Sequence, residues 1–205
     1  MNAHDRESGL VDPAVFIDKD GTLVEDVPFN VDPSRVRLAS GAGEALRLLA
    51  DHGYRLIIVT NQSGVARGLF TEGDVEAMGR HLATRLASDG ARIDGFYFCP
   101  HLPNATVERY RRACDCRKPG AGLIVRAASD LGIDIARSWM LGDIATDVAA
   151  GQAAGCRTGL VNAQPERELV QLRRPPDLVA ADLSTAARVL VSLPAGKAGA
   201  GVQPS

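Results

Sequence analysis

Short apolar runs alternate with amphipathic segments along most of the chain, and this alternation constrains the fold more than any other feature. Near-continuous apolar runs of about four to eight residues are typical of strands buried on both faces of a parallel sheet. Such runs lie at residues 14–18, 55–60, 93–99, 138–142 and 157–162.

Apolar residues at helical spacing follow most of these runs, with capping residues such as Thr71 and Gly132 at the expected ends. Alternation of strand and helix predicts an α/β fold, in which a mostly parallel sheet is covered by helices on both faces. The helices are expected at residues 41–52, 71–88, 120–131, 146–154 and 183–193.

Length and composition fit one globular domain of this kind. The chain has 205 residues, of which 45% are hydrophobic and 23% charged, as is usual for a domain with its own core. We expect the domain at residues 13–193, after a flexible N-terminus at residues 1–12. Residues 194–205 are rich in Gly, Ala and Pro, and we expect a disordered tail there.

The charge balance argues against several classes of partner. The formal net charge is -2 and the isoelectric point is about 6.1, which disfavours nucleic acid or an anionic membrane as the main partner. No apolar run approaches the ~18 residues of a membrane span, and the polar N-terminus does not resemble a secretory signal. We therefore expect a cytoplasmic protein, and a monomer, since no hydrophobic stripe is left unexplained.

Polar residues at the carboxyl ends of the predicted strands are the first candidates for function, because ligands of parallel α/β sheets bind there. Asp18 and Asp20 follow the first run, and Gly21 lets the chain turn both carboxylates toward one pocket. Close carboxylates repel unless a cation compensates, and carboxylates that share a hard divalent ion with a phosphate are typical of Mg²⁺ sites. Taken alone, this motif also fits a solvated turn, or a calcium loop that lacks its later Glu.

Other strand ends add groups of complementary chemistry. Thr60 and Asn61 precede a Gly-containing loop whose N–H groups can cradle a phosphate. Lys118 stands just before an expected helix, near its positive end. Asp143 and Asp147 form a second acidic pair after the fourth run. Each signal is weak by itself, but their combination in one α/β chain indicates a metal- and phosphate-binding site.

Three of the four cysteines crowd around a histidine. Cys99-x-His101 and Cys114-x-Cys116 have the spacing of a closed, tetrahedral zinc site. The loop between the two pairs is polar and is expected to lack a core of its own, so that a zinc ion would offset the entropy of ordering it. The alternative is three reduced thiols and a surface histidine. The remaining cysteine, Cys156, begins a predicted strand and is expected in the core.

Together these motifs resemble those of the haloacid dehalogenase (HAD) superfamily of phosphohydrolases. Its four motifs occur in order as Asp18-x-Asp20-Gly21-Thr22, Thr60, Lys118, and Gly142-Asp143 with Asp147. Residues 59–68 and the two cysteine pairs more closely resemble the D-glycero-D-manno-heptose 1,7-bisphosphate phosphatases and the histidinol-phosphate phosphatases. The resemblance implies a Rossmann-like HAD fold without a cap domain, a zinc-binding loop at residues 99–116, and an open site for small phosphorylated metabolites.

The resemblance also implies a role for each motif residue. Asp18 is then the nucleophile that forms an aspartyl phosphate, and Asp20 the general acid and base. Catalytic Mg²⁺ is bound by the Asp18 carboxylate, the Asp20 main-chain carbonyl and Asp143, and Asp147 supports this shell. Donors that stabilise the transferring phosphate come from Thr60, Asn61 and Lys118. A structural Zn²⁺ is bound by Cys99, His101, Cys114 and Cys116.

The substrate implied by the resemblance is D-glycero-D-manno-heptose 1,7-bisphosphate, which would lose its 7-phosphate on the way to nucleotide-activated heptose. Histidinol phosphate or another small sugar phosphate is the alternative. Arg117 is the candidate for holding a second anionic or polyol end, unless it is a surface arginine, and Arg67 could reach a second phosphate or be structural. The residues expected to contact substrate are Asp26, Val27, Pro28, Phe29, Gln62, Ser63, Arg67 and Arg117.

Three features differ from the related phosphatases and leave the sugar and its anomer open. Lys19 stands where arginine is frequent, and its side chain could simply point to solvent. Ile144 stands where a lysine often touches substrate, and residues 27–30 are not of the His-Gly-Tyr type. A receiver-type signalling domain, which also uses Asp, Thr and Lys with Mg²⁺, is the non-enzymatic alternative. It would lack Asp20 and would have no need of a zinc loop.

Overall fold

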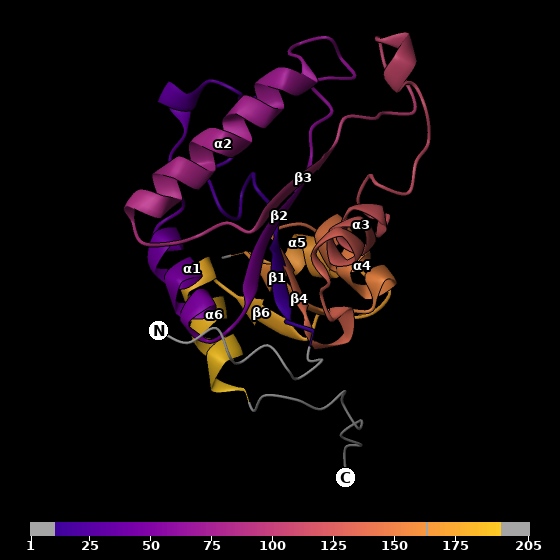
Figure 1. The fold of residues 1–205 in the computed structure, drawn as a ribbon. Coiled ribbons are helices and arrows are strands. Elements are labelled where there is room, and N and C mark those ends of the chain that lie inside the picture. Colours follow the sequence, from indigo (N-terminus) through magenta and orange to yellow (C-terminus); the bar gives the residue numbers. More distant parts are fainter. Residues whose placement is uncertain (1–10, 163, 194–205) are drawn as a thin grey trace.

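The structure is a computed structural model that describes residues 11–162 and 164–193. At its centre lies a six-stranded parallel sheet with the order β3-β2-β1-β4-β5-β6 (Figure 1). The strands are β1 (Ala14–Ile17), β2 (Arg55–Asn61), β3 (Gly95–Cys99), β4 (Trp139–Gly142), β5 (Arg157–Val161) and β6 (Leu178–Ala180). The first five confirm the predicted strands. The expected tail at 194–205, and residues 1–10 of the expected flexible N-terminus, lie outside the described residues.

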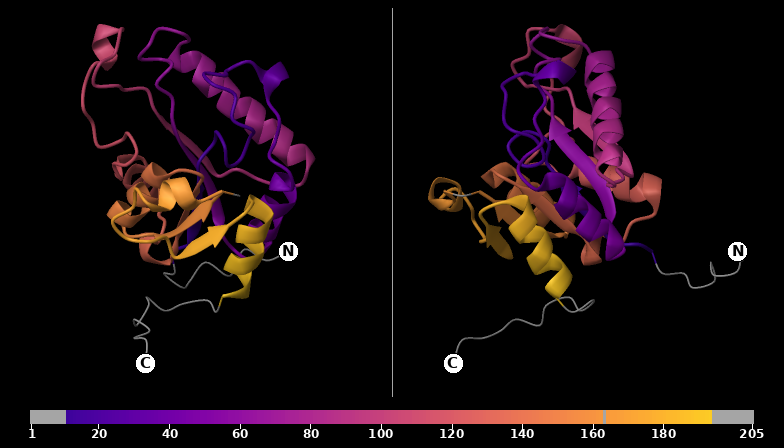
Figure 2. Two further views of the ribbon diagram at one scale, coloured as in Figure 1. Left: turned by 180° about the vertical axis from the view of Figure 1, so that it is seen from behind. Right: turned by 90° about the vertical axis from the view of Figure 1, so that its left-hand side faces the viewer.

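Helices cover both faces of this sheet, as predicted (Figure 2). Side chains of α1, α2 and α6 share one buried cluster with Val15 and Ile17 of β1. Side chains of α3 and α4 share a second cluster with Ala14 and Phe16. The helices are α1 (Ala42–Asp51), α2 (Glu72–Ser88), α3 (Gly122–Leu131), α4 (Ala145–Ala154), α5 (Glu166–Leu169) and α6 (Leu183–Ser192), with 3₁₀ turns η1 (Pro33–Arg35), η2 (Glu108–Tyr110) and η3 (Ile135–Arg137).

The two clusters explain why β1 is apolar throughout. Successive side chains of a strand point to opposite faces of the sheet, and here both faces are covered by helices. All four side chains of β1 are fully buried. Burial on both sides fixes the position of β1 in the middle of the sheet, and the residues that follow it, beginning with Asp18, emerge at the carboxyl edge.

Helix ends follow the local signals in the sequence. Thr71 begins α2 with a capping box, in which its hydroxyl accepts a hydrogen bond from the Asp74 N–H and the Asp74 carboxylate accepts one from the Thr71 N–H. Gly132 ends α3 in the left-handed conformation, with φ of 63°. None of the described helices combines the length and apolar character that a membrane span requires.

Two short elements were missed by the sequence analysis. α5 has four residues and β6 has three, which is too short for a periodic pattern to emerge. The strand expected from residue 93 begins only at Gly95, the first residue in register with β2. Just before it, the Asp94 carboxylate accepts a hydrogen bond from the Leu56 N–H at 2.9 Å, so this residue joins the two strands through its side chain.

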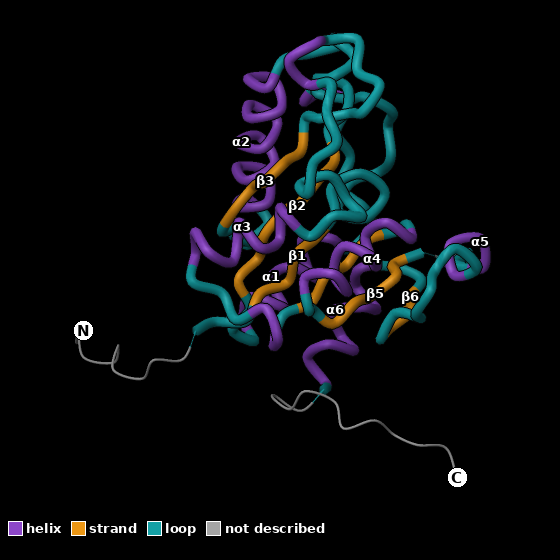
Figure 3. Tube along the Cα trace, turned by 90° about the vertical axis from the view of Figure 1, so that its right-hand side faces the viewer, coloured by secondary structure: helices purple, strands orange, loops and turns teal. Residues whose placement is uncertain are grey.

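Long loops, and no inserted domain, lie beyond the carboxyl ends of β1 and β2 (Figure 3). Between β1 and α1, residues 18–41 include the 3₁₀ turn η1 and isolated β-bridges at Asp20, Val24 and Leu38, and between β2 and α2, residues 62–71 form no helix or strand. The expectation that no cap domain is inserted at these points is confirmed. No separate domain therefore covers the carboxyl edge of the sheet at these two points.

The loop between the two cysteine pairs has a small core, contrary to our expectation. Ala105 and Tyr110 are buried in a cluster with Val65, Ala66 and Val75 from the β2–α2 segment. The Tyr110 hydroxyl also donates a hydrogen bond to Glu72, in the first turn of α2, at 2.5 Å. This loop is therefore held against the loop that follows β2 by apolar contacts as well as by the cysteine cluster at its base.

Candidate active site

A buried lysine lies at the centre of the polar groups beyond the sheet. Lys118, in the segment before α3, places its Nζ atom 2.5 Å from Asp18 Oδ1 and 2.6 Å from Asp147 Oδ1. The same ammonium group donates to the Val59 carbonyl at 3.1 Å. Burial alone would lower the pKa of Lys118, but the carboxylates of Asp147 and Asp18 outweigh it and raise that pKa above its usual value. Lys118 is therefore charged at neutral pH.

Three carboxylates gather around this ammonium group. One oxygen from each of Asp18, Asp143 and Asp147 lies within 4.8 Å of the others. Burial raises the pKa of Asp18 to about 7, Lys118 opposes this shift, and Asp147 and Asp143 add to it. Burial and the Asp147 charge likewise raise the pKa of Asp143 to about 6. Such crowding favours a bound cation, and a set of carboxylate oxygens fits the hard ligands that Mg²⁺ prefers.

Glycine is required where the first motif meets the fourth. Gly21 has φ of 85°, and a Cβ atom there would lie 2.4 Å from Asp143 Oδ2. Next to it, the Thr22 hydroxyl donates to Asp143 Oδ1 at 3.3 Å. The loop after β1 is thus packed directly on the Asp143 side chain, which explains why Gly21 and Thr22 stand at these positions of the motif.

The second aspartate of the first motif is held by two donors. Asp20 Oδ1 accepts from Lys19 Nζ at 2.5 Å, and Oδ2 accepts from Gln62 Nε2 at 3.0 Å. Gln62 Nε2 also lies 2.9 Å from Thr60 Oγ1. The Lys19 side chain is buried, so the idea that it points to solvent is wrong. Its role was missed because nothing in the local sequence shows that the chain folds it against Asp20.

Asn61 contacts the main chain of Lys118 in both directions. Its Nδ2 donates to the Lys118 carbonyl at 3.2 Å, and its Oδ1 accepts from the Lys118 N–H at 3.0 Å. Both polar atoms of the amide are therefore engaged. The structure places Asn61 beside Lys118, where it holds the main chain rather than projecting into open space.

The predicted zinc ligands converge in space. Cys99 Sγ lies 3.6 Å from Cys114 Sγ and 3.2 Å from Cys116 Sγ, and the last two sulfurs are 3.2 Å apart. His101 Nδ1 lies 3.3 Å from Cys116 Sγ. Sulfurs at the corners of a tetrahedral zinc site are about 3.8 Å apart, so only a small expansion would admit the ion. Four soft or borderline donors with no place for a water ligand fit structural zinc.

The other cysteine behaves as predicted. Cys156 is buried among apolar side chains of the α3–α4 cluster, and burial raises the pKa of its thiol to about 12. It lies with the core and not with the three clustered cysteines.

Expected substrate-contacting residues lie partly on the surface around these groups. Asp26, Pro28 and Phe29 are exposed, and Val27 and Ser63 are half-buried. Phe29 has φ of 53°, rare for a residue with a side chain, and the Arg67 guanidinium lies 5.5 Å from the centre of its ring.

Arg117 is half-buried, and one of its guanidinium nitrogens is inaccessible. Within the described part of the chain, Arg117 Nη1 is buried and has no hydrogen-bond partner. A buried, unpaired guanidinium nitrogen is costly unless a ligand supplies the acceptor. The packing of one guanidinium edge inside the protein contradicts the alternative of a surface arginine, and contact between Arg117 and substrate stays a prediction.

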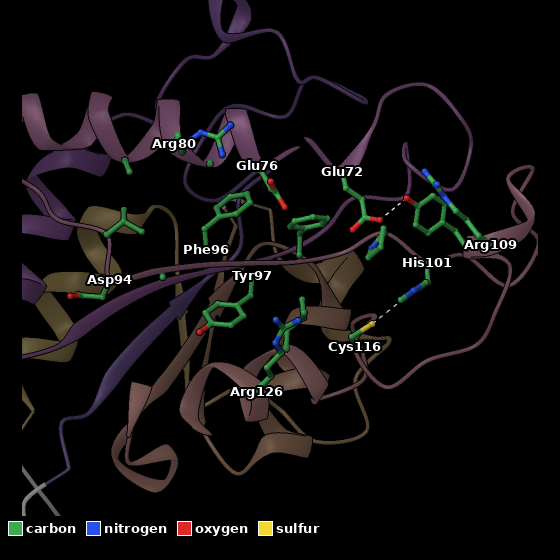
Figure 4. A pocket seen from close by; sticks show the side chains of 18 of the residues that line it. Glu72, Glu76, Arg80, Asp94, Phe96, Tyr97, His101, Arg109, Cys116 and Arg126 are labelled. Carbon is green, nitrogen blue, oxygen red and sulfur yellow. Dashed lines mark hydrogen bonds between the residues drawn. The ribbon is translucent and has the colours of Figure 1, made fainter. Parts of the chain in front are cut away.

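Two hollows of different chemistry accompany the site. One of about 270 Å³ lies against Gly21, Thr22, Asp143 and Asn162. A groove of about 770 Å³ runs instead along the outer edge of β3, between α2 and α3 (Figure 4). Side chains such as Glu76, Phe96 and Arg126 line it, and Asp18 and Asp20 do not. Its size gives no reason to move the chemistry away from the carboxylates.

Comparisons with known proteins agree with the fold and the site. The HAD-hydrolase-like family profile matches residues 115–186. Two solved structures superimpose on most of the chain. A D,D-heptose 1,7-bisphosphate phosphatase from B. bronchiseptica, complexed with magnesium and phosphate, has a TM-score of 0.75 at 29% identity and covers 87% of this chain and 98% of its own. A putative HAD-like phosphatase from Mesorhizobium loti has a TM-score of 0.76 at 28% identity, covering 88% and 84%.

Fold and site thus define a phosphohydrolase of the haloacid dehalogenase class. Curated relatives narrow this further. The D-glycero-beta-D-manno-heptose-1,7-bisphosphate 7-phosphatase of Rhodopseudomonas palustris is 45% identical over 70% of this chain and 79% of its own. The enzyme of that name from Escherichia coli K12 is 41% identical over 71% and 76%. The chain belongs to the HAD phosphatase family that contains these enzymes, which argues against the receiver-domain alternative.

Proposed function

We propose that this phosphatase removes the 7-phosphate of D-glycero-D-manno-heptose 1,7-bisphosphate with Mg²⁺ as cofactor. The observation that carries the chemistry is the buried Asp18 carboxylate beside Lys118, in one cluster with Asp143. The names of the relatives support the substrate. Arg117, half-buried and next to Lys118 in the chain, is the residue to which we assign a second anionic end of the substrate.

In the proposed mechanism, Asp18 attacks phosphorus while the bond to the leaving oxygen breaks, which gives an aspartyl phosphate. Asp20 donates a proton to the leaving alkoxide and then removes one from the water that hydrolyses this intermediate. Asp18, the Asp20 main-chain carbonyl and Asp143 would hold Mg²⁺. When bound, the ion reduces the repulsion between the Asp18 carboxylate and the phosphate.

The remaining residues orient these groups. Lys19 and Gln62 each donate to one oxygen of Asp20, which would keep its carboxyl group aimed at the leaving oxygen. Thr60 and Lys118 would stabilise the equatorial phosphate oxygens. Asn61 holds the Lys118 main chain, so we assign it a positioning role in place of the phosphate contact predicted from sequence. Asp147 is fully buried and paired with Lys118, which favours support of the metal site over direct coordination.

We assign a structural role to zinc in the cysteine cluster, because the site is closed and Cys116 is separated from Lys118 by one residue. We expect about one equivalent of zinc in the purified protein by metal analysis. Replacing Cys114 by Ser should remove it, lower the melting temperature and reduce kcat, because the chain around Lys118 loses an anchor. Cys156→Ser is the matched control and should keep the zinc. A zinc-free wild-type protein with full activity would contradict this role.

The function is tested by phosphate release with Mg²⁺ from both anomers of heptose 1,7-bisphosphate and from histidinol phosphate, side by side. A kcat/KM above ~10⁴ M⁻¹s⁻¹ on one heptose anomer, and far lower values on the other compounds, is the expected result. A higher kcat/KM on histidinol phosphate than on either heptose anomer would identify the protein as a histidinol-phosphate phosphatase instead. Weak and equal rates on all three would retain the phosphatase chemistry and discard the heptose substrate.

A further inference from the structure

The segment that follows β5 contacts the metal-site loop at two points. Asn162, the residue after β5, donates from Nδ2 to the Asp143 carbonyl at 3.0 Å. Glu168, in α5, accepts a hydrogen bond from the Ala145 N–H through Oε2 at 2.7 Å. The two contacts lie on either side of Ile144. They therefore hold the main chain of the loop that carries Asp143 from both ends.

Further hydrogen bonds hold both contacting residues, Asn162 through its main chain and side chain and Glu168 through its main chain. The Asn162 N–H donates to the Ala180 carbonyl of β6 at 2.9 Å, and Asn162 Oδ1 accepts from the Gln164 N–H at 2.8 Å. The Glu168 N–H donates to the Pro165 carbonyl at 3.0 Å, within the turn that forms α5. Both side chains are half-buried. Because Asn162 and Glu168 are held in this way, their hydrogen bonds can fix the position of the loop that carries Asp143.

The Asp143 side chain has little room of its own. It is packed against Gly21, where even a Cβ atom would approach within 2.4 Å, and it accepts a hydrogen bond from Thr22. A shift of the main chain at residues 143–145 would therefore displace the carboxylate relative to Asp18. The first N–H groups of a helix also lack partners within the helix, and Glu168 provides one for Ala145 at the start of α4.

We propose that Asn162 and Glu168 are positioning residues for the magnesium site, acting through the main chain on both sides of Ile144. Neither residue touches the reacting atoms in this arrangement. The inference rests on the magnesium site proposed above, in which Asp143 is a ligand. Outer groups that orient metal ligands commonly change metal affinity about 10–100-fold when they are removed.

The test is the Mg²⁺ dissociation constant of the substrate-free protein, measured by isothermal titration calorimetry. Glu168→Ala and Asn162→Ala should each weaken Mg²⁺ binding about tenfold, while the melting temperature without Mg²⁺ falls by only a few degrees. Glu168→Gln keeps an oxygen that can accept from the Ala145 N–H, so it should bind Mg²⁺ within about twofold of wild type. Glu166→Ala, an exposed carboxylate on the same short helix, is the matched control and should bind as wild type.

Three outcomes overturn the proposal. Unchanged Mg²⁺ affinity in both alanine variants would show that the contacts do not position Asp143. An equal loss in Glu168→Gln and Glu168→Ala would show that the charge acts and not the hydrogen bond. Losses matched by Glu166→Ala would point to a general charge effect. Wild-type protein that binds Mg²⁺ but hydrolyses no heptose bisphosphate would refute the proposed substrate, and would leave this inference standing if the variants behave as stated.

Discussion

Replacing Asp18 by Asn is expected to lower kcat by about 10⁴-fold or more while the protein stays folded. The amide cannot form the aspartyl phosphate, so the covalent route is lost. Its shape is nearly that of the carboxyl group, and its oxygen can still accept from Lys118. Burial and neighbouring carboxylates raise the pKa of Asp18, so ionised Asp18 is strained at this position. Removing the charge relieves this repulsion but also takes one carboxylate from Lys118, which keeps Asp147, so the melting temperature should stay close to that of wild type.

Phosphate release under saturating Mg²⁺ and a thermal melt of the same sample measure the two effects together. Asp51→Asn, an exposed carboxylate in the last turn of α1, is the matched control and should change neither. A kcat of Asp18→Asn within tenfold of the wild-type value would contradict the assignment of Asp18 as the nucleophile. If the melt shows that Asp18→Asn is unfolded, the same two measurements are made on Asp18→Ser, which also lacks the carboxylate.

Replacing Lys118 by Met should reduce kcat by about 10³-fold and also destabilise the protein. The lost ammonium stabilises charge on the transferring phosphate, and one such donor is worth on the order of 10²–10³ in rate. It also leaves Asp18 and Asp147 without their cation, and removing one member of a buried pair costs about 3–5 kcal/mol. The two losses distinguish Lys118 from Asp18, whose removal costs rate alone.

A second variant separates charge from shape. Lys118→Arg keeps the charge, but a planar guanidinium cannot occupy the site of a compact ammonium 2.5 Å from Asp18 and 2.6 Å from Asp147. We expect it to recover part of the stability and little of the rate. Steady-state kinetics with a denaturant melt would measure both, and a Lys118→Met enzyme that kept most of its kcat would contradict the role given to the ammonium.

Much of the fold follows from the local pattern because its signals are local. β1 is apolar at all four positions, β2 is apolar from Leu56 to Val59, and α2 begins at a visible capping box. β6 and α5 were not predicted because an element of three or four residues is too short to show a hydrophobic periodicity. The small core around Tyr110 escaped for another reason: its apolar partners, such as Val65 and Val75, lie some 35 or more residues earlier in the chain.

The candidate site was predictable where the parallel topology of the sheet alone brings residues together. In a parallel sheet, residues after different strands meet at one edge, so Asp18 and Asp143 could be placed together from sequence. The cysteine pairs were predictable from their spacing. Lys19, Asn162 and Glu168 were not, because their contacts depend on how loops fold over that edge, and no motif marks them. Asn61 was found, but its partner is the Lys118 main chain, a contact that sequence does not show.

The most direct test of the account follows the hydrolysis of heptose 1,7-bisphosphate by ³¹P nuclear magnetic resonance with Mg²⁺ present. The account predicts that the 7-phosphate resonance disappears, that inorganic phosphate grows in its place, and that the 1-phosphate resonance remains. Loss of the 1-phosphate first, or no release by an enzyme shown to bind Mg²⁺, would contradict the assignment of this chain as a 7-phosphatase.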